Sequence, residues 1–269
     1  GKKKLRWIGS AFSFKNLGRG YFTDMHFLDS DGQGMLDLIA LQALPQDSYD
    51  GVIVTNPFGL CTNFAPYIHF AKATGKKLII DNAAGMGRDV ARWPWQVFSL
   101  HHTKPYGAGE GGLVLSPTDT ADFMKLLINY DAVPRDPAYW LNNGKISDIS
   151  CAFLIDRLRR IDEWEAGYIE QRARVTEIFA GFGLTPLLPI EGAPPTNSLP
   201  VLLGGVVNGQ NVLNTRRIDI ARQYQPLAPL PQTLAIFDQN INFTPHPGLD
   251  SDTDDEITDE VATLLTHVS

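Results

Sequence analysis

The chain is poor in cysteine and contains no long apolar run. Only two of its 269 residues are cysteines, Cys61 and Cys151, and neither belongs to a C-x-x-C pattern. This spacing excludes a disulfide framework and a cysteine-based metal motif, and it predicts reduced thiols in a cytoplasmic protein. No stretch reaches the ~18–20 apolar residues of a membrane span, and the first residues lack the apolar core of a signal peptide. We therefore expect no contact with a membrane.

Positive charge is also scarce. The sequence has 23 Lys and Arg against 30 Asp and Glu, which gives a formal net charge of −7. The short basic run at residues 2–4 is too small for a nucleic-acid footprint, so we expect no nucleic-acid partner. The glycines within 18–22 and 32–36 do not form a G-x-G-x-x-G turn between a strand and a helix. The lack of a G-x-G-x-x-G turn argues against a nucleotide-dependent dehydrogenase.

Short apolar runs alternate with helical patterns in the first half of the chain. Strand-like runs are 21–29, 51–59, 76–81, 95–100 and 111–116, and helix-like segments are 34–44 and 63–74. Such alternation indicates a mixed or parallel central sheet flanked by helices. A long helical pattern with one apolar face begins after Ser147, a strand pattern covers 197–207, and an acidic-capped helix pattern covers 250–268. We predict an α/β fold, with a large domain over 1–148 and a smaller α+β domain over 149–269.

The most informative stretch reads FSLHHTKPYGAGEGG, residues 98–112, and contains Lys104 between a strand end and a glycine-rich turn. Upstream, Asp81 ends the apolar run KKLIID. A lysine that forms a Schiff base, together with an aspartate that pairs with a pyridine nitrogen, is the protein side of pyridoxal phosphate chemistry. The plain alternatives are a surface lysine in a turn and an aspartate that caps the next helix.

Neighbouring polar residues fit the same chemistry. Ser99 can donate a hydrogen bond to a phosphate, and the alternative is a strand-end serine satisfied by the backbone. His101 can contact phosphate or substrate, and a structural histidine is about as plausible. Because no cysteine or carboxylate stands at ligand spacing to His101 and His102, we predict no metal site.

These residues resemble the DegT/DnrJ/EryC1/StrS family of sugar aminotransferases, which are pyridoxal phosphate enzymes of fold type I. The resemblance covers nearly the whole chain, through the segments 8–14, 25–37, 52–59, 98–112, 142–158, 221–228 and 242–249. It implies that Lys104 is the Schiff-base lysine, that Asp81 pairs with the pyridine nitrogen, and that Ser99 binds the phosphate. It further implies that Phe14 stacks on the cofactor ring and that Asn143 reaches the phosphate of a neighbouring subunit.

The resemblance also implies a reaction and a partner. The expected reaction transfers an amino group, with glutamate as donor, to a nucleotide-linked keto sugar in a homodimer with shared active sites. Tyr139 and Trp140, which precede the Asn143 loop, are candidates for lining the substrate pocket; for these, as for Tyr224 and Phe243, core packing is the alternative.

Two departures from the family pattern keep other readings open. Ala84 stands where the family usually has Gln or His, and members usually carry about eighty more residues before the first strand, including a turn at a helix N-terminus that binds phosphate. A degenerate or regulatory pyridoxal phosphate-binding relative is therefore one alternative. A sugar dehydratase on the same scaffold is another, although such enzymes have histidine in place of Lys104.

Overall fold

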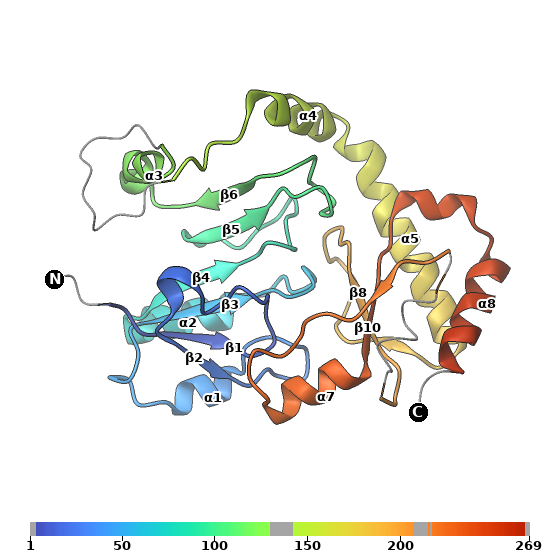
Figure 1. Ribbon diagram of the computed structural model, residues 1–269, viewed down its shortest axis with the longest axis horizontal. Coiled ribbons are helices and arrows are strands. Elements are labelled where there is room, and N and C mark those ends of the chain that lie inside the picture. Colours follow the sequence, from blue (N-terminus) through green and yellow to red (C-terminus); the bar gives the residue numbers. More distant parts are fainter. Residues whose placement is uncertain (1–3, 130–141, 207–214, 216, 267–269) are drawn as a thin grey trace.

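The computed structural model describes residues 4–129, 142–206, 215 and 217–266 (Figure 1). Its first half is built on a six-stranded sheet with the order β2-β1-β3-β4-β5-β6. The strands are β1 (Trp7–Ser10), β2 (Met25–Leu28), β3 (Gly51–Thr55), β4 (Lys77–Asp81), β5 (Gln96–Ser99) and β6 (Gly112–Leu115). The first five are parallel, and β6 joins the edge of β5 antiparallel. The predicted mixed sheet is therefore confirmed.

Local sequence signals explain where the helices beside this sheet begin and end. The helices are α1 (Leu38–Ala43), α2 (Ala65–Thr74) and α3 (Ala121–Leu127), with short 3-10 turns at Gly20–Phe22 and Thr118–Thr120. The Asp37 carboxylate caps α1 by accepting from the backbone N–H groups of the first turn. Gly75 ends α2 in a left-handed conformation with φ of 68°. Apolar residues of both helices and of β1, β3 and β4 form one buried cluster, which fixes α1 and α2 against the sheet.

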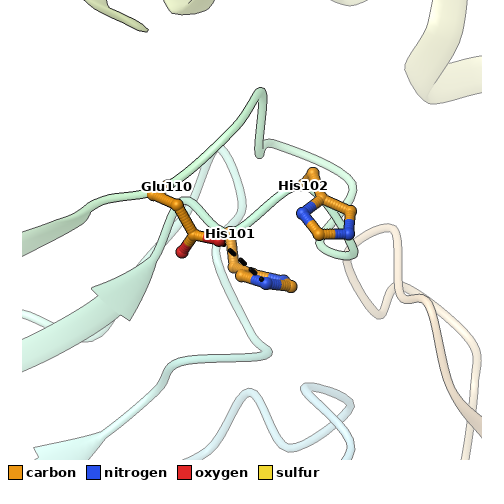
Figure 2. Close-up of side chains that lie close together, drawn as sticks. All are labelled: His101, His102 and Glu110. Atoms are coloured by element: carbon orange, nitrogen blue, oxygen red, sulfur yellow. Dashed lines mark ion pairs between the residues drawn. The ribbon is translucent and has the colours of Figure 1, made fainter. Parts of the chain in front are cut away.

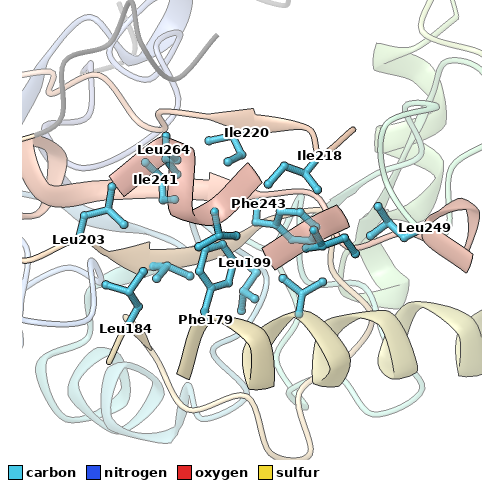
Figure 3. Packing of buried hydrophobic residues seen from close by; sticks show 14 residues of the cluster. Phe179, Leu184, Leu199, Leu203, Ile218, Ile220, Ile241, Phe243, Leu249 and Leu264 are labelled. Atoms are coloured by element: carbon cyan, nitrogen blue, oxygen red, sulfur yellow. The ribbon is translucent and has the colours of Figure 1, made fainter. Parts of the chain in front are cut away.

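The second half of the chain contains a smaller antiparallel sheet with the order β7-β8-β10-β9. Its strands are β7 (Thr185–Pro186), β8 (Leu199–Leu202), β9 (Ile220–Ala221) and β10 (Asn240–Phe243). The helices here are α4 (Asp148–Arg159), α5 (Ile161–Gly181), α7 (Pro231–Gln239) and α8 (Asp254–Leu265), with a 3-10 turn at Pro247–Ser251. Figure 3 shows the apolar core that α5 and α8 make with this sheet, centred on Phe179, Leu199 and Phe243. None of the helices in the described ranges is long and apolar enough to cross a membrane.

The long helical pattern after Ser147 forms two helices. Ser147 caps α4 as expected, its hydroxyl accepting from the N–H of Ser150 at 3.1 Å. The helix then breaks at Arg160, where φ is −104° and ψ is 24°, and α5 starts at the next residue. The apolar face of α4 is exposed in this chain, with 73% of Ile149 and 64% of Phe153 accessible.

The two halves share packing and hydrogen bonds beside the carboxyl ends of the parallel strands. Phe12 and Phe58 from the first half pack with Leu188, Ala193 and Ile236 from the second in a buried cluster. Backbone and side-chain hydrogen bonds reinforce this contact, from the N–H of Leu227 to the carbonyl of Ala11 at 2.8 Å and from the hydroxyl of Thr196 to the carbonyl of Phe58 at 2.7 Å. The boundary at residue 148 stays a prediction, although α4 begins there.

Candidate active site

Three polar residues stand at the carboxyl ends of three adjacent parallel strands. Thr55 ends β3, Asp81 ends β4 and Ser99 ends β5. Thr55 and Asp81 are paired in the strand register, which places their side chains beside each other. Ligands of open α/β sheets bind outside the carboxyl ends of the strands. The fold thus brings two of the sequence-predicted residues to the edge where a cofactor is expected.

The Asp81 carboxylate is held in an environment that favours its neutral form. Burial raises the pKa of Asp81, while the N–H of Ala83, the charge of Lys104 and the Thr55 hydroxyl act in the opposite direction without cancelling the effect. The Ala83 N–H donates to Oδ1 at 3.2 Å. A buried carboxylate of this kind gains from a cationic partner, since an opposite charge nearby favours ionisation.

Lys104 lies in a tight loop whose hydrogen bonds fix its backbone. Its N–H donates to the carbonyl of His101 at 2.8 Å, and its own carbonyl accepts from the N–H of Gly107 at 2.8 Å. Gly107 is required because a Cβ there would lie 1.9 Å from the His101 carbonyl oxygen. The glycine-rich sequence therefore serves the shape of the loop that carries the lysine.

The amine of Lys104 has no hydrogen-bond or ion-pair partner among the residues that the structure describes. Burial lowers the pKa of Lys104, and the charge of Asp81 opposes this. The two groups therefore act on each other electrostatically, yet they form no ion pair within 4.0 Å in the described part of the chain. The amine of Lys104 is therefore available to bond to a further group close to the Asp81 carboxylate.

Ser99 keeps a proton to donate. Its hydroxyl oxygen accepts from the N–H of His101 at 3.2 Å, and this contact leaves the hydroxyl hydrogen available to an acceptor. The side chain is half-buried at the end of β5. It is suited to hold a phosphate oxygen.

Helices α4 and α5 anchor the Lys104 loop through contacts that the sequence did not indicate. The Tyr106 hydroxyl donates to Oε1 of Glu165 at 2.8 Å, and Oε2 of Glu165 pairs with Nε of Arg88 at 2.5 Å. Nε of Arg157 donates to the carbonyl of Pro105 at 2.7 Å. The ring of Trp164 packs edge-on against Tyr106, with centroids 5.0 Å apart. Tyr106 and Glu165 are 59 residues apart, so no local pattern could have paired them.

Of the aromatic candidates, Tyr224 lies near Asp81, Phe14 is exposed and Phe243 lies in the second core. Phe14, expected to stack on the cofactor, is half exposed beyond the carboxyl end of β1, and that role stays a prediction. Tyr224 packs with Phe12 and Phe58 at ring distances of 5.9 and 5.8 Å and donates to the carbonyl of Pro57. Burial raises the pKa of Tyr224, and the charge of Asp81 adds to this, so Tyr224 lies near the site. Phe243 is fully buried in the second core.

The other candidates are only partly described. Nδ1 of His101 lies 2.8 Å from the Thr103 hydroxyl, and its Nε2 lies 3.3 Å from Oε1 of Glu110. Asn143 is exposed in the segment before α4, and Tyr139 and Trp140 lie outside the described residues. Ala84 is buried. Its carbonyl oxygen packs closely against Gly59, since a Cβ atom added to Gly59 would lie 2.1 Å from that oxygen.

The donor set fits pyridoxal phosphate. The free amine of Lys104 can bond to its aldehyde, the buried Asp81 carboxylate can pair with its ring nitrogen, and the Ser99 hydroxyl can hold its phosphate.

Solved structures share the fold. Helicobacter pylori PseC, described as an aminotransferase involved in the biosynthesis of pseudoaminic acid, superposes with a TM-score of 0.82 at 17% identity, covering 99% of this chain and 81% of that one. A DegT DnrJ EryC1 StrS aminotransferase from Brucella abortus gives 0.80 at 17% identity, covering 98% and 80%. DesI, crystallised in the presence of its TDP-sugar product, gives 0.78 at 20% identity, covering 97% and 74%. These likenesses show the PLP-dependent aminotransferase fold that was predicted.

Sequence comparison supports the same relationship. Protein Rv3402c of Mycobacterium tuberculosis is 28% identical over 127 residues, which are 44% of this chain and 31% of that protein. The chain thus spans less than a third of the length of the curated relatives it matches. The family model of the DegT/DnrJ/EryC1/StrS aminotransferases, which are pyridoxal phosphate-dependent, matches residues 23–210. The sequence predicted this family from the Lys104 segment, and the chain belongs to the DegT/DnrJ/EryC1/StrS aminotransferase family.

Proposed function

We propose that this chain carries the active site of a pyridoxal phosphate-dependent aminotransferase that transfers an amino group from glutamate to a nucleotide-linked keto sugar. The observation that carries the proposal is the relation of Asp81 to Lys104. The two groups extend from the carboxyl edge of one sheet and act on each other's charge without touching. Family membership supports the reaction type, because this is a family of aminotransferases.

Each residue has a distinct task in this reaction. Pyridoxal phosphate supplies an aldehyde for covalent attachment and an electron-withdrawing ring. The Nζ of Lys104 would hold the cofactor at its aldehyde carbon, with loss of water, until the donor amine takes its place; the freed amine would then move the substrate proton as general base and acid. The Asp81 carboxylate would hold a proton on the ring nitrogen, and the Ser99 hydroxyl would orient the phosphate. Phe14 would stack on the ring and exclude water from one face.

The substrate side of the proposal rests on the neighbours. PseC is involved in the biosynthesis of pseudoaminic acid, and DesI was crystallised in the presence of its TDP-sugar product. We assign His101, Tyr139 and Trp140 to substrate contact. Among these, His101 stands in the same loop as Lys104, three residues before it.

A second copy of the chain completes the site in this proposal. The apolar side chains of α4 are exposed, and Asn143 is exposed just before that helix. A homodimer that buries α4 would remove this apolar surface from water and bring Asn143 to the partner's phosphate. The free thiols of Cys61 and Cys151 agree with a cytoplasmic location.

Ala84 favours a second candidate, a pyridoxal phosphate-binding relative without turnover. The residue is buried and offers only a methyl group where the family usually has Gln or His. A sugar dehydratase is opposed by the presence of Lys104.

An absorbance titration separates these candidates. Purified chain is mixed with pyridoxal phosphate, next to Lys104→Ala and to Lys125→Ala as a matched control, since Lys125 is an exposed lysine on α3. We expect a visible band that borohydride removes in the parent and the control, and none in Lys104→Ala. Glutamate should bleach the band and yield its keto acid, with transfer reduced about 10²–10⁴-fold in Lys104→Ala. A band that glutamate leaves unchanged would favour the relative without turnover, and a folded parent without a band would overturn both.

A further inference from the structure

We propose that His101, His102 and Glu110 form a binding site for a divalent transition-metal ion of the zinc class. Each residue offers one ligand atom, and these atoms all lie within 4.8 Å of one another (Figure 2). The site shares His101 with the substrate contacts proposed above, but it uses neither Lys104, Asp81 nor Ser99, and metal binding can be measured without the aminotransferase reaction. It also revises the sequence-based expectation of no metal.

The ligand chemistry selects the metal. Two imidazoles and one carboxylate form a set that zinc uses in open sites, with water in the fourth position. Calcium and magnesium prefer oxygen ligands, so a pair of histidines disfavours them. Because His101 is half-buried and the other two residues are exposed, an ion can reach the site directly.

The spacing of two ligand atoms already matches a bound ion. Nε2 of His101 lies 3.3 Å from Oε1 of Glu110. Two ligands bonded at about 2.0–2.1 Å to one tetrahedral zinc are about 3.3 Å apart. The ring centroids of His101 and His102 are 4.0 Å apart, and the ring planes are tilted by 37°. A rotation of the exposed His102 side chain would place one of its ring nitrogens as the third ligand.

Thr103 can orient the His101 ring for metal binding. Its N–H donates to Nδ1 of His101 at 3.3 Å, and its hydroxyl lies 2.8 Å from the same nitrogen. These contacts hold the His101 ring in place with Nε2 toward Glu110, 3.3 Å from Oε1.

The backbone explains how residues separated in sequence meet. The N–H of His102 donates to the carbonyl of Gly109 at 2.6 Å, and that of Leu100 donates to the carbonyl of Gly111 at 2.9 Å. These bonds bring the two limbs of the Lys104 loop together. A metal held by His101, His102 and Glu110 would link the limbs and stabilise the loop.

The test uses the untagged full chain without pyridoxal phosphate, because a histidine tag and the cofactor both bind metals. After treatment with chelator, the chain is titrated with Co²⁺, followed by its visible absorption, and with Zn²⁺ by calorimetry. The variants are His102→Gln and Glu110→Gln, and the control is His69→Gln, which removes an exposed histidine on α2.

We expect one equivalent of metal in the parent and in His69→Gln, with affinity weakened about tenfold or more in His102→Gln and Glu110→Gln. Zn²⁺ should also raise the melting temperature of the parent and the control, and leave that of Glu110→Gln unchanged. Equal affinity in all four proteins, or no binding to a folded parent, would overturn the site.

Discussion

The hydroxyl of Tyr106 donates to the buried carboxylate of Glu165 at 2.8 Å, and this bond ties the Lys104 loop to helix α5. Removing the hydroxyl in Tyr106→Phe leaves one oxygen of Glu165 without a donor. We expect a loss of about 1–3 kcal/mol in the free energy of unfolding, the range for a buried group left unsatisfied. Urea denaturation measures this value.

Tyr168→Phe is the control for that change. Tyr168 is a neighbouring aromatic on α5, and its hydroxyl makes no hydrogen bond among the described residues. We expect its cost to stay within about 0.5 kcal/mol. Equal losses in the two variants would show that the Tyr106–Glu165 bond does not stabilise the fold.

Asp81→Asn should stabilise the cofactor-free chain while abolishing amino transfer. Burial raises the pKa of Asp81 in the folded state, so the folded chain favours the protonated carboxyl group. The protonated group contributes to the free energy of unfolding at low pH. This contribution is lost as the pH rises above the ordinary range of an aspartate and through the raised pKa. Asn is neutral at every pH. The stability advantage of the variant, measured by urea denaturation, should therefore grow from pH 5 to pH 8. A variant that is less stable than the parent at both pH values would contradict this account.

Asp29→Asn should destabilise the contact between β2 and α7. Oδ1 of Asp29 accepts from the N–H and hydroxyl of Thr233 at 2.8 and 2.7 Å, and Oδ2 accepts from the N–H of Gln232 at 2.9 Å. Burial acts to raise the pKa of Asp29, but these bonds outweigh it and the pKa is lowered. We expect a cost of about 1–2 kcal/mol at pH 7.

The pH dependence of that cost gives a second measurement. A lowered pKa contributes stability above the ordinary range of an aspartate, and this contribution is lost as the pH falls through the folded-state value. The difference in the free energy of unfolding between the parent and Asp29→Asn should therefore become smaller at acidic pH. Asp89→Asn, at an exposed aspartate, should match the parent throughout. A difference that stays constant from pH 7 to pH 3 would exclude the charge as its cause.

Phe153→Ser should weaken self-association if α4 forms the dimer contact. Phe153 is 64% exposed, and its removal from a buried interface would cost apolar contact area. Light scattering at several concentrations should find dimers of the parent and monomers of the variant. Ile39→Ser is the control, because Ile39 is 80% exposed on α1. A parent that is monomeric at all concentrations would remove the proposed interface.

The sequence predicted the parts of the molecule that depend on local pattern. Apolar runs identified β3, β4 and β5, and because parallel strands end at one edge, Asp81 and Ser99 had to meet there. Ser147 was predicted as a helix cap from the same kind of local signal, and its hydrogen bond confirms it.

The remaining features depend on contacts between distant residues. The break at Arg160 interrupts a continuous helical pattern without a proline or glycine to mark it. The approach of Glu110 to His101 depends on the register of the β5–β6 hairpin, and that of Tyr106 to Glu165 depends on how two halves of the chain pack. Neither leaves a periodic signal.

Helix α5 connects two regions of the molecule, because one end contacts the Lys104 loop and the other end is buried in the second core. It has 21 residues, a length of about 30 Å at 1.5 Å per residue. Its first turns contact the Lys104 loop through Trp164 and Glu165, while Val175 and Phe179 near its other end are fully buried in the second core. Because α5 is one continuous helix, a shift along its axis would displace the residues at both ends by the same distance. A variant that repacks the core around Phe179 and shifts α5 along its axis would therefore also displace Trp164 and Glu165, which contact the Lys104 loop.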